Sequence, residues 1–191
     1  MQLRTRFLLA IGAGALACMP MQAQMAGHSP AAQAANDPTR NGMVQTDQNM
    51  DATFLKNTAE ANMGEVAAAK MAQTKSQNDD VKNFAQHMID DHTAMEKDVE
   101  SAAAGLKVTL PTVPSKSDQK EAQKLAAMDG AAFDKAYMDA QVKGHKKVLA
   151  EMKHESSTTQ NAQLRDLATK GSQKVAEHLK MAEDIQAKLG K

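Results

Sequence analysis

The strongest constraint on this chain is an apolar repeat whose steps alternate between four and three residues. Such steps return to the same side of an α-helix, so each repeat predicts an amphipathic helix with one buried face. The repeat is clearest near the carboxyl end, at Leu164, Ala168, Gly171, Val175, His178, Ala182, Ile185 and Leu189. We therefore expect a long helix there, after the turn at residues 156–160.

Three earlier segments show the same period. They predict helices over about residues 47–75, from the turn at 76–78 to Gly105, and from about Asp129 onward. The stripe of the first segment is Phe54, Thr58, Ala61, Glu65, Ala68 and Ala72.

Four amphipathic helices bury their stripes by packing together, which predicts an all-α four-helix bundle of two antiparallel hairpins. The long crossover between the hairpins should contain a short helix, because Ser115 and Asp118 form a capping-box pattern. With no Trp, one Tyr and four Phe among 191 residues, the chain is poor in the aromatic residues that favour β-structure.

The amino-terminal segment predicts export. Arg4 and Arg6 precede an apolar run that ends near Met19, and Pro20 and small residues follow. This order is typical of a bacterial secretory signal, and the run is too short to span a bilayer. We expect a signal peptide over 1–23, a flexible linker over 24–46, the bundle over 47–191, and no membrane span.

The single cysteine, Cys18, lies within the predicted signal. One interpretation is that the mature domain has no disulfide. Another is that residues 15–18 resemble a lipobox, so that an acylated Cys18 tethers the protein to an envelope membrane. Both place the protein in the periplasm or at the outer membrane. Equal numbers of basic and acidic residues, 23 each, indicate no nucleic-acid partner.

One titratable side chain interrupts the apolar stripe of each long helix: Glu65, His92, His145 and His178. Burying such a group is costly unless it is paired, hydrogen-bonded or bound to metal. One carboxylate and three imidazoles are suitable ligands for a transition metal ion such as zinc, iron, manganese or copper. The alternative is a set of buried polar pairs, such as Glu65 with His92, that fix the register of the helices.

The four candidate ligands are expected at different heights along the bundle. Counted from the predicted turns, Glu65 and His92 differ in height by about 4.5 Å, whereas His145 and His178 differ by about 13 Å. The counting therefore favours two small polar clusters over a single four-ligand centre. No phosphate loop, nucleophile elbow or H-E-x-x-H motif is present in the sequence. The primary hypothesis is a non-enzymatic envelope protein with a structural, stress-related or partner-binding role, and the alternative is a metal-binding bundle.

From about Asp51 to Leu189 the chain resembles the bacterial domain-of-unknown-function family 4142. The carrying residues are V-K-N-F-A-Q-H-M-I-D-D-H ending at His92, F-D-K-A-Y from Phe133, and the pair His178-Leu179. The resemblance implies an exported protein of the outer membrane or envelope, with a ferritin-like helical bundle and no established reaction. A proline common before the last histidine of such proteins is absent here, where residues 173–175 are Gln-Lys-Val.

Overall fold

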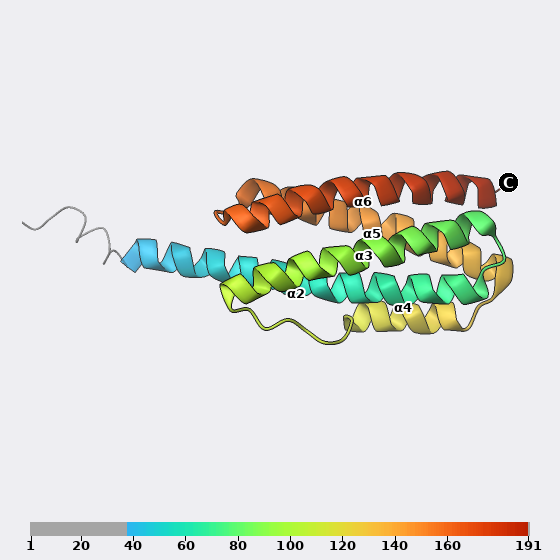
Figure 1. The fold of residues 1–191 in the computed structure, drawn as a ribbon, viewed down its shortest axis with the longest axis horizontal. Coiled ribbons are helices and arrows are strands. Elements are labelled where there is room, and N and C mark those ends of the chain that lie inside the picture. Colours follow the sequence, from blue (N-terminus) through green and yellow to red (C-terminus); the bar gives the residue numbers. More distant parts are fainter. Residues whose placement is uncertain (1–37, 191) are drawn as a thin grey trace, which may run out of the picture. The chain divides into compact units, whose positions relative to one another are not determined.

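The computed structural model describes residues 38–190, and this range contains five helices and no strand. The helices are α2 (Pro38–Lys75), α3 (Asp79–Leu106), α4 (Lys116–Ala126), α5 (Gly130–Thr158) and α6 (Ala162–Leu189). Helices α2 and α3 form one hairpin, α5 and α6 form the other, and α4 lies in the crossover (Figure 1). The all-α class and the helical bundle are confirmed. The predicted signal peptide, Cys18 and residues 24–37 of the predicted linker lie outside the described residues.

Side-chain caps fix where three of the helices begin. The Oδ1 atom of Asn78 accepts a hydrogen bond from the backbone N–H of Val81 at the start of α3. Ser115 caps α4 by accepting from the N–H of Asp118, as the capping-box pattern predicts. Asn161 caps α6 by accepting from two backbone N–H groups. Capping satisfies N–H groups that have no partner within their own helix, which stabilises these boundaries.

Helix α2 begins at Pro38 rather than near Asp47. Proline is tolerated in the first turn of a helix, where its missing N–H has no partner to lose. The part of the predicted linker from residue 38 onward is therefore helical, and residues 45–50 are exposed to solvent. No helix of the described range is long and apolar enough to cross a membrane.

The buried face of α2 includes Thr58 and Ala72 of the predicted stripe, but around residues 54–65 it is displaced by one residue. Leu55, Ala59 and Asn62 are buried, whereas Phe54 and Glu65 are only partly buried. Positions 55, 59, 62, 66 and 69 also follow steps of four and three, so the sequence allowed both registers. The observed register brings a polar amide, that of Asn62, into the interior.

Two apolar cores lie at different heights in the bundle. The first core is nearer the α2–α3 turn and includes Ala69, Ala72, Val81, Phe84, Ala85, Met88, Leu125, Phe133, Tyr137, Met138, Val142, Ala182 and Ile185. The second core consists of Leu55, Ala59, Val99, Ala102, Ala103 and Leu164. Neither core includes residues 89–98 of α3 or 165–181 of α6 among its buried members. A separate layer with other residues therefore lies between them.

Removing the ring of Phe84 should test the first core. Phe84 is 2 % exposed, and its ring lies edge-on to that of Tyr137 with centroids 6.1 Å apart. Because a cavity would remain, Phe84→Ala is expected to lower the free energy of unfolding by about 3–5 kcal/mol in urea denaturation. The control Val113→Ala, at a residue 57 % exposed, should change it by less than about 0.5 kcal/mol. Equal effects of the two substitutions would contradict this packing.

Candidate metal centre

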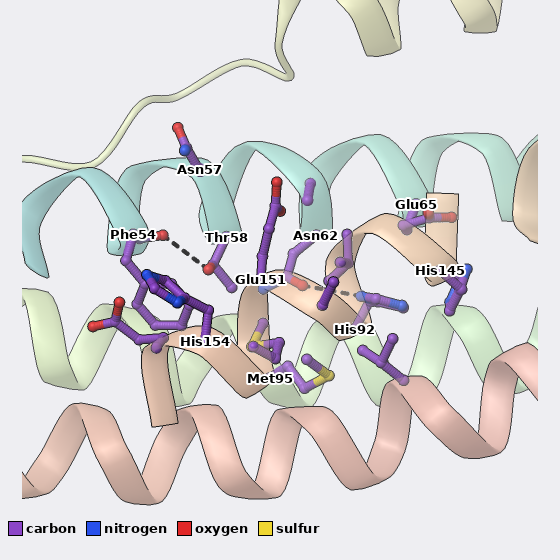
Figure 2. Close-up of a pocket in the computed structure, with 16 residues that line it drawn as sticks. Phe54, Asn57, Thr58, Asn62, Glu65, His92, Met95, His145, Glu151 and His154 are labelled. Carbon is purple, nitrogen blue, oxygen red and sulfur yellow. Dashed lines mark hydrogen bonds between the residues drawn. The ribbon is translucent and has the colours of Figure 1, made fainter. Parts of the chain in front are cut away.

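A cavity of about 400 Å³ occupies the layer between the two cores (Figure 2). All four long helices line it, with Ala61 and Asn62 on α2, Met95 on α3, Val148 on α5 and Val175 on α6. The side chains of His92 and His145 form part of its wall. Three of the four predicted site residues, Glu65, His92 and His145, therefore line this cavity.

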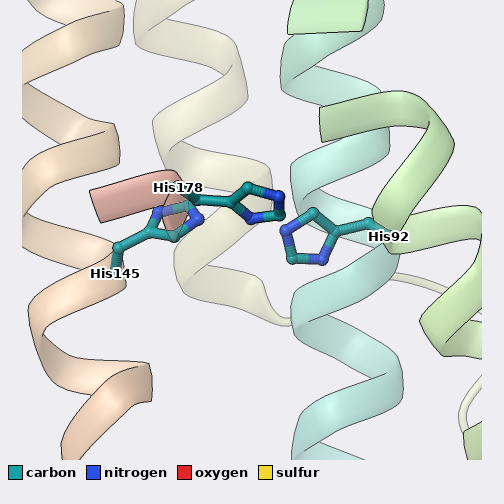
Figure 3. Close-up of side chains that lie close together, drawn as sticks. All are labelled: His92, His145 and His178. Carbon is teal, nitrogen blue, oxygen red and sulfur yellow. The ribbon is translucent and has the colours of Figure 1, made fainter. Parts of the chain in front are cut away.

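Three histidines converge beside this cavity (Figure 3), and two of them, His92 and His145, line it. His92 on α3, His145 on α5 and His178 on α6 are 4 %, 2 % and 0 % exposed, respectively. One ring nitrogen from each lies within 4.8 Å of those of the other two. Imidazole ligands that lie this close, on three different helices, match the geometry by which helical bundles hold metal ions.

One nitrogen of each ring is held by a hydrogen-bond acceptor. His92 Nδ1 lies 2.9 Å from Asn62 Oδ1, and His145 Nδ1 lies 2.9 Å from the backbone oxygen of Gln141. His178 Nε2 lies 2.9 Å from Asp91 Oδ2. A carbonyl, a carboxylate and an amide oxygen only accept, so each of these ring nitrogens carries the proton.

The remaining nitrogen of each ring therefore carries a lone pair. These atoms are His92 Nε2, His145 Nε2 and His178 Nδ1, and each is buried without a hydrogen-bond partner among the described residues. A buried acceptor that lacks a partner costs about 1–3 kcal/mol, so three together are a large cost for a small domain. Three lone pairs at one buried point are the arrangement that a metal cation satisfies.

A carboxylate stands behind each histidine. Asp91 bonds His178 directly. Glu96 Oε2 accepts from Asn62 Nδ2 at 2.8 Å, which orients the amide so that its oxygen faces His92. Glu65 Oε2 accepts from Gln141 Nε2 at 2.6 Å, on the residue whose backbone oxygen holds His145. Such outer partners fix the orientation of metal-ligating rings and strengthen them as donors.

Burial keeps two of the imidazoles neutral. The pKa of His92 is well below its ordinary value, because burial disfavours the charged form and the neighbouring His145 and His178 repel it. Burial also lowers the pKa of His178, although its bond to Asp91 acts in the opposite direction. Neutral imidazole is the form that binds a metal, so these rings need not lose a proton near neutral pH.

The fourth predicted ligand, Glu65, lies outside the group of converging atoms. It is partly buried and lines the cavity, but its carboxylate is bonded to Gln141. The expected polar pair of Glu65 with His92 is wrong, because the partner of His92 is Asn62. The sequence reasoning missed Asn62, which the alternative α2 register would have placed in the interior.

The predicted separation of His145 and His178 is also wrong. Their ring centroids lie 5.5 Å apart. Helix α5 continues to Thr158, and α6 begins only at Ala162, so the turn is centred near residue 160. Counted from there, His145 lies 15 residues before and His178 18 residues after, a height difference of about 4.5 Å.

Residues 28–185 match the family profile described as domain of unknown function (DUF4142). The chain belongs to this family. No curated protein and no solved structure matches the chain in the two other comparisons. The family resemblance carried by the segment ending at His92 and by F-D-K-A-Y is confirmed.

The metal-free DUF4142 domain should lose stability as the pH falls below 6.5. Unfolded histidines gain protons near their ordinary pKa of 6.5, whereas folded His92 and His178, with lowered pKa values, stay neutral. Stability is therefore full above pH 6.5 and decreases below it. In urea denaturation with a chelator present, the free energy of unfolding should fall by at least about 1 kcal/mol from pH 7 to pH 5.5.

Two variants test whether the buried histidines cause this loss of stability at low pH. His92→Gln removes one buried titrating group, so its pH dependence should be weaker by about 1 kcal/mol over the same range. His87→Gln, at an exposed position on the same helix, should retain the full dependence. A stability that stays constant down to pH 5.5 would contradict the neutral, buried state of these rings.

Proposed function

We propose that this DUF4142 protein is an exported bundle that binds one transition metal ion through His92, His145 and His178. The observation that carries the proposal is the convergence of three buried imidazole lone pairs, none of which has a hydrogen-bond partner within residues 38–190. Neutral imidazole suits zinc, copper, nickel and iron, and Cu²⁺ binds such nitrogens most tightly among the first-row divalent ions.

The spacing of the three nitrogens supports this assignment. A tetrahedral zinc ion with bonds of about 2.0–2.1 Å holds its ligands about 3.3 Å apart. In the structure, one nitrogen of each ring lies within 4.8 Å of one nitrogen of each of the other two rings. Small rotations of the three rings therefore suffice to bring them to bonding distance without movement of the helices.

A purely structural role fits the hydrogen bonds less well. Buried groups that fix helix register pair with one another, so that each donor meets an acceptor. Here each ring donates a hydrogen bond to an acceptor on its outer side. The other nitrogen of each ring receives no hydrogen bond from the described part of the chain. If the histidines served only to fix helix register, the cost of three unpaired buried nitrogens would remain. A bound metal ion would remove that cost.

Glu65 belongs to the proposal as a positioning residue. Its bond to Gln141 joins α2 to α5 beside His145, and it contributes one of the three carboxylates around the site. We assign the metal-binding role to the three histidines, with Glu65, Asp91 and Glu96 balancing part of the charge of the ion.

Two further parts of the proposal concern fold family and location. The order of two hairpins joined by a long crossover with its own short helix supports a ferritin-like bundle. The basic start, apolar run and small residues of segment 1–23 support export to the periplasm or outer membrane.

Metal analysis tests the central proposal. Protein purified without chelator or affinity metal and then dialysed against zinc or copper should hold about one ion per chain in elemental analysis. His145→Gln removes one of three ligands and should weaken binding by at least about 100-fold in a competition titration. Metal should raise the melting temperature of the unmodified protein, because binding favours the folded state.

The matched control is His87→Gln, which changes an exposed histidine on α3 and should leave affinity and stoichiometry unchanged. Circular dichroism must show that both variants keep their helical content. Metal that binds equally well to His145→Gln, or binding far below one ion per chain, would overturn the assignment.

Export is tested by the mass of the mature chain. Expression of the full sequence in a Gram-negative bacterium should yield a periplasmic protein that begins at Gln24, after cleavage at Ala23. If Cys18 is acylated instead, the chain begins there, and palmitate labelling disappears in Cys18→Ser. Full-length chain retained in the cytoplasm would contradict both routes.

A further inference from the structure

The cavity above the three histidines has the form of a ligand pocket. We propose that it receives an uncharged organic molecule with a nitrogen donor, which completes the coordination of the metal ion. This inference rests on the proposed metal site and adds to it an open coordination position and a class of ligand.

One side of the histidine layer is closed. A turn away from the three histidines, toward the α2–α3 turn, lie Met88, Val142 and Ala182, which are 0 %, 7 % and 0 % exposed. All three belong to the first core. Close-packed side chains leave no room there for a further ligand of the metal.

The other side of the layer opens into the cavity. A turn away in that direction lie Met95 on α3, Val148 on α5 and Val175 on α6, and all three line the cavity. A metal ion held by three histidines has a fourth position available, as catalytic and ligand-binding zinc sites do. Because the first core closes one side, the fourth position faces the cavity.

The size and walls of the cavity indicate an organic ligand rather than water alone. Its volume is about 400 Å³, within the range of about 300–1,000 Å³ typical of small-molecule pockets. Most of the wall surface is apolar, with contributions from Phe54, Ala61, Met95, Met152 and Val175; Figure 2 shows Phe54 and Met95 among the residues around the cavity. An apolar group attached to the coordinating atom would therefore be removed from water on binding.

The carboxylates on the walls disfavour anions, although one of them, that of Glu151, is paired with Lys147 Nζ at 3.6 Å. The acidic side chains that line the cavity are Glu65, Glu151 and Glu155, and the described residues contribute no Lys or Arg to its lining. Glu151 and His154 are exposed and lie on the rim between α2 and α5. A carboxylate ligand would have to pass and remain near like charges, whereas a neutral nitrogen base would not.

Cobalt(II) provides a visible probe of the fourth ligand. The full chain, loaded with Co²⁺, is titrated with imidazole, 4-phenylimidazole and octanoate while the visible absorption of the bound ion is recorded. Imidazole and 4-phenylimidazole present the same donor, but only the second adds an apolar ring. We expect 4-phenylimidazole to bind at least about tenfold more tightly than imidazole, and octanoate to leave the spectrum unchanged.

Filling the cavity should abolish this preference. Ala61→Phe places a ring in the cavity wall and should reduce the advantage of 4-phenylimidazole over imidazole to less than about threefold. The control Ala67→Phe adds the same ring at an exposed position of α2 and should leave the preference intact. Val148→Phe narrows the cavity from α5 and gives the same test if Ala61→Phe does not fold.

The outcomes separate this inference from the metal proposal. If Co²⁺ does not bind in one-to-one ratio, the metal site and the pocket both fall. If Co²⁺ binds, but phenyl substitution gives no advantage, or octanoate binds as well as 4-phenylimidazole, the metal site stands and this inference is overturned. It is likewise overturned if Ala61→Phe and Val148→Phe both fold and keep the preference.

Discussion

The conflict among three buried lone pairs is the constraint on which the rest of the site depends. Each imidazole of His92, His145 and His178 has its proton fixed toward an acceptor, so none can donate to another. The two apolar cores, which lie on either side of the polar layer, stabilise the fold enough to offset the cost of these unpaired nitrogens. A bundle with one continuous core would have no need of such a layer for stability, so its presence points to a ligand.

The outer hydrogen bonds also decide how the helices are placed relative to one another. His92 donates to Asn62 and so joins α3 to α2, and His178 donates to Asp91 and joins α6 to α3. Gln141 donates to Glu65 and joins α5 to α2. A shift of any of these helices by one turn, about 5.4 Å, would break one of these contacts. The bonds that orient the rings therefore also hold the register that brings them together.

The helical period and the caps could be predicted from the sequence. The heights of the histidines along the bundle could not, because they depend on where each turn lies. The stripes of α3 and α6 and the cap at Ser115 follow local rules that act within a few residues. The Ser-Ser-Thr-Thr run looked like a turn. In the structure, the hydroxyls of Ser156 and Ser157 bond carbonyls three residues earlier, so α5 continues past them. That shift of the turn is what allows His145 and His178 to meet.

The position of Glu65 explains why the proposed inner ligand set consists of the histidines alone. A carboxylate that reached the metal would reduce the positive charge there, but Gln141 holds this one at the side. Glu65, Asp91 and Glu96 instead stand one residue or one bond behind the three rings, so negative charge surrounds a neutral ligand set. A divalent ion held by these three neutral rings would act as a Lewis acid toward a donor atom that enters from the cavity. The proposed site would thus combine an open coordination position on the cavity side with three carboxylates on the outer side of the rings.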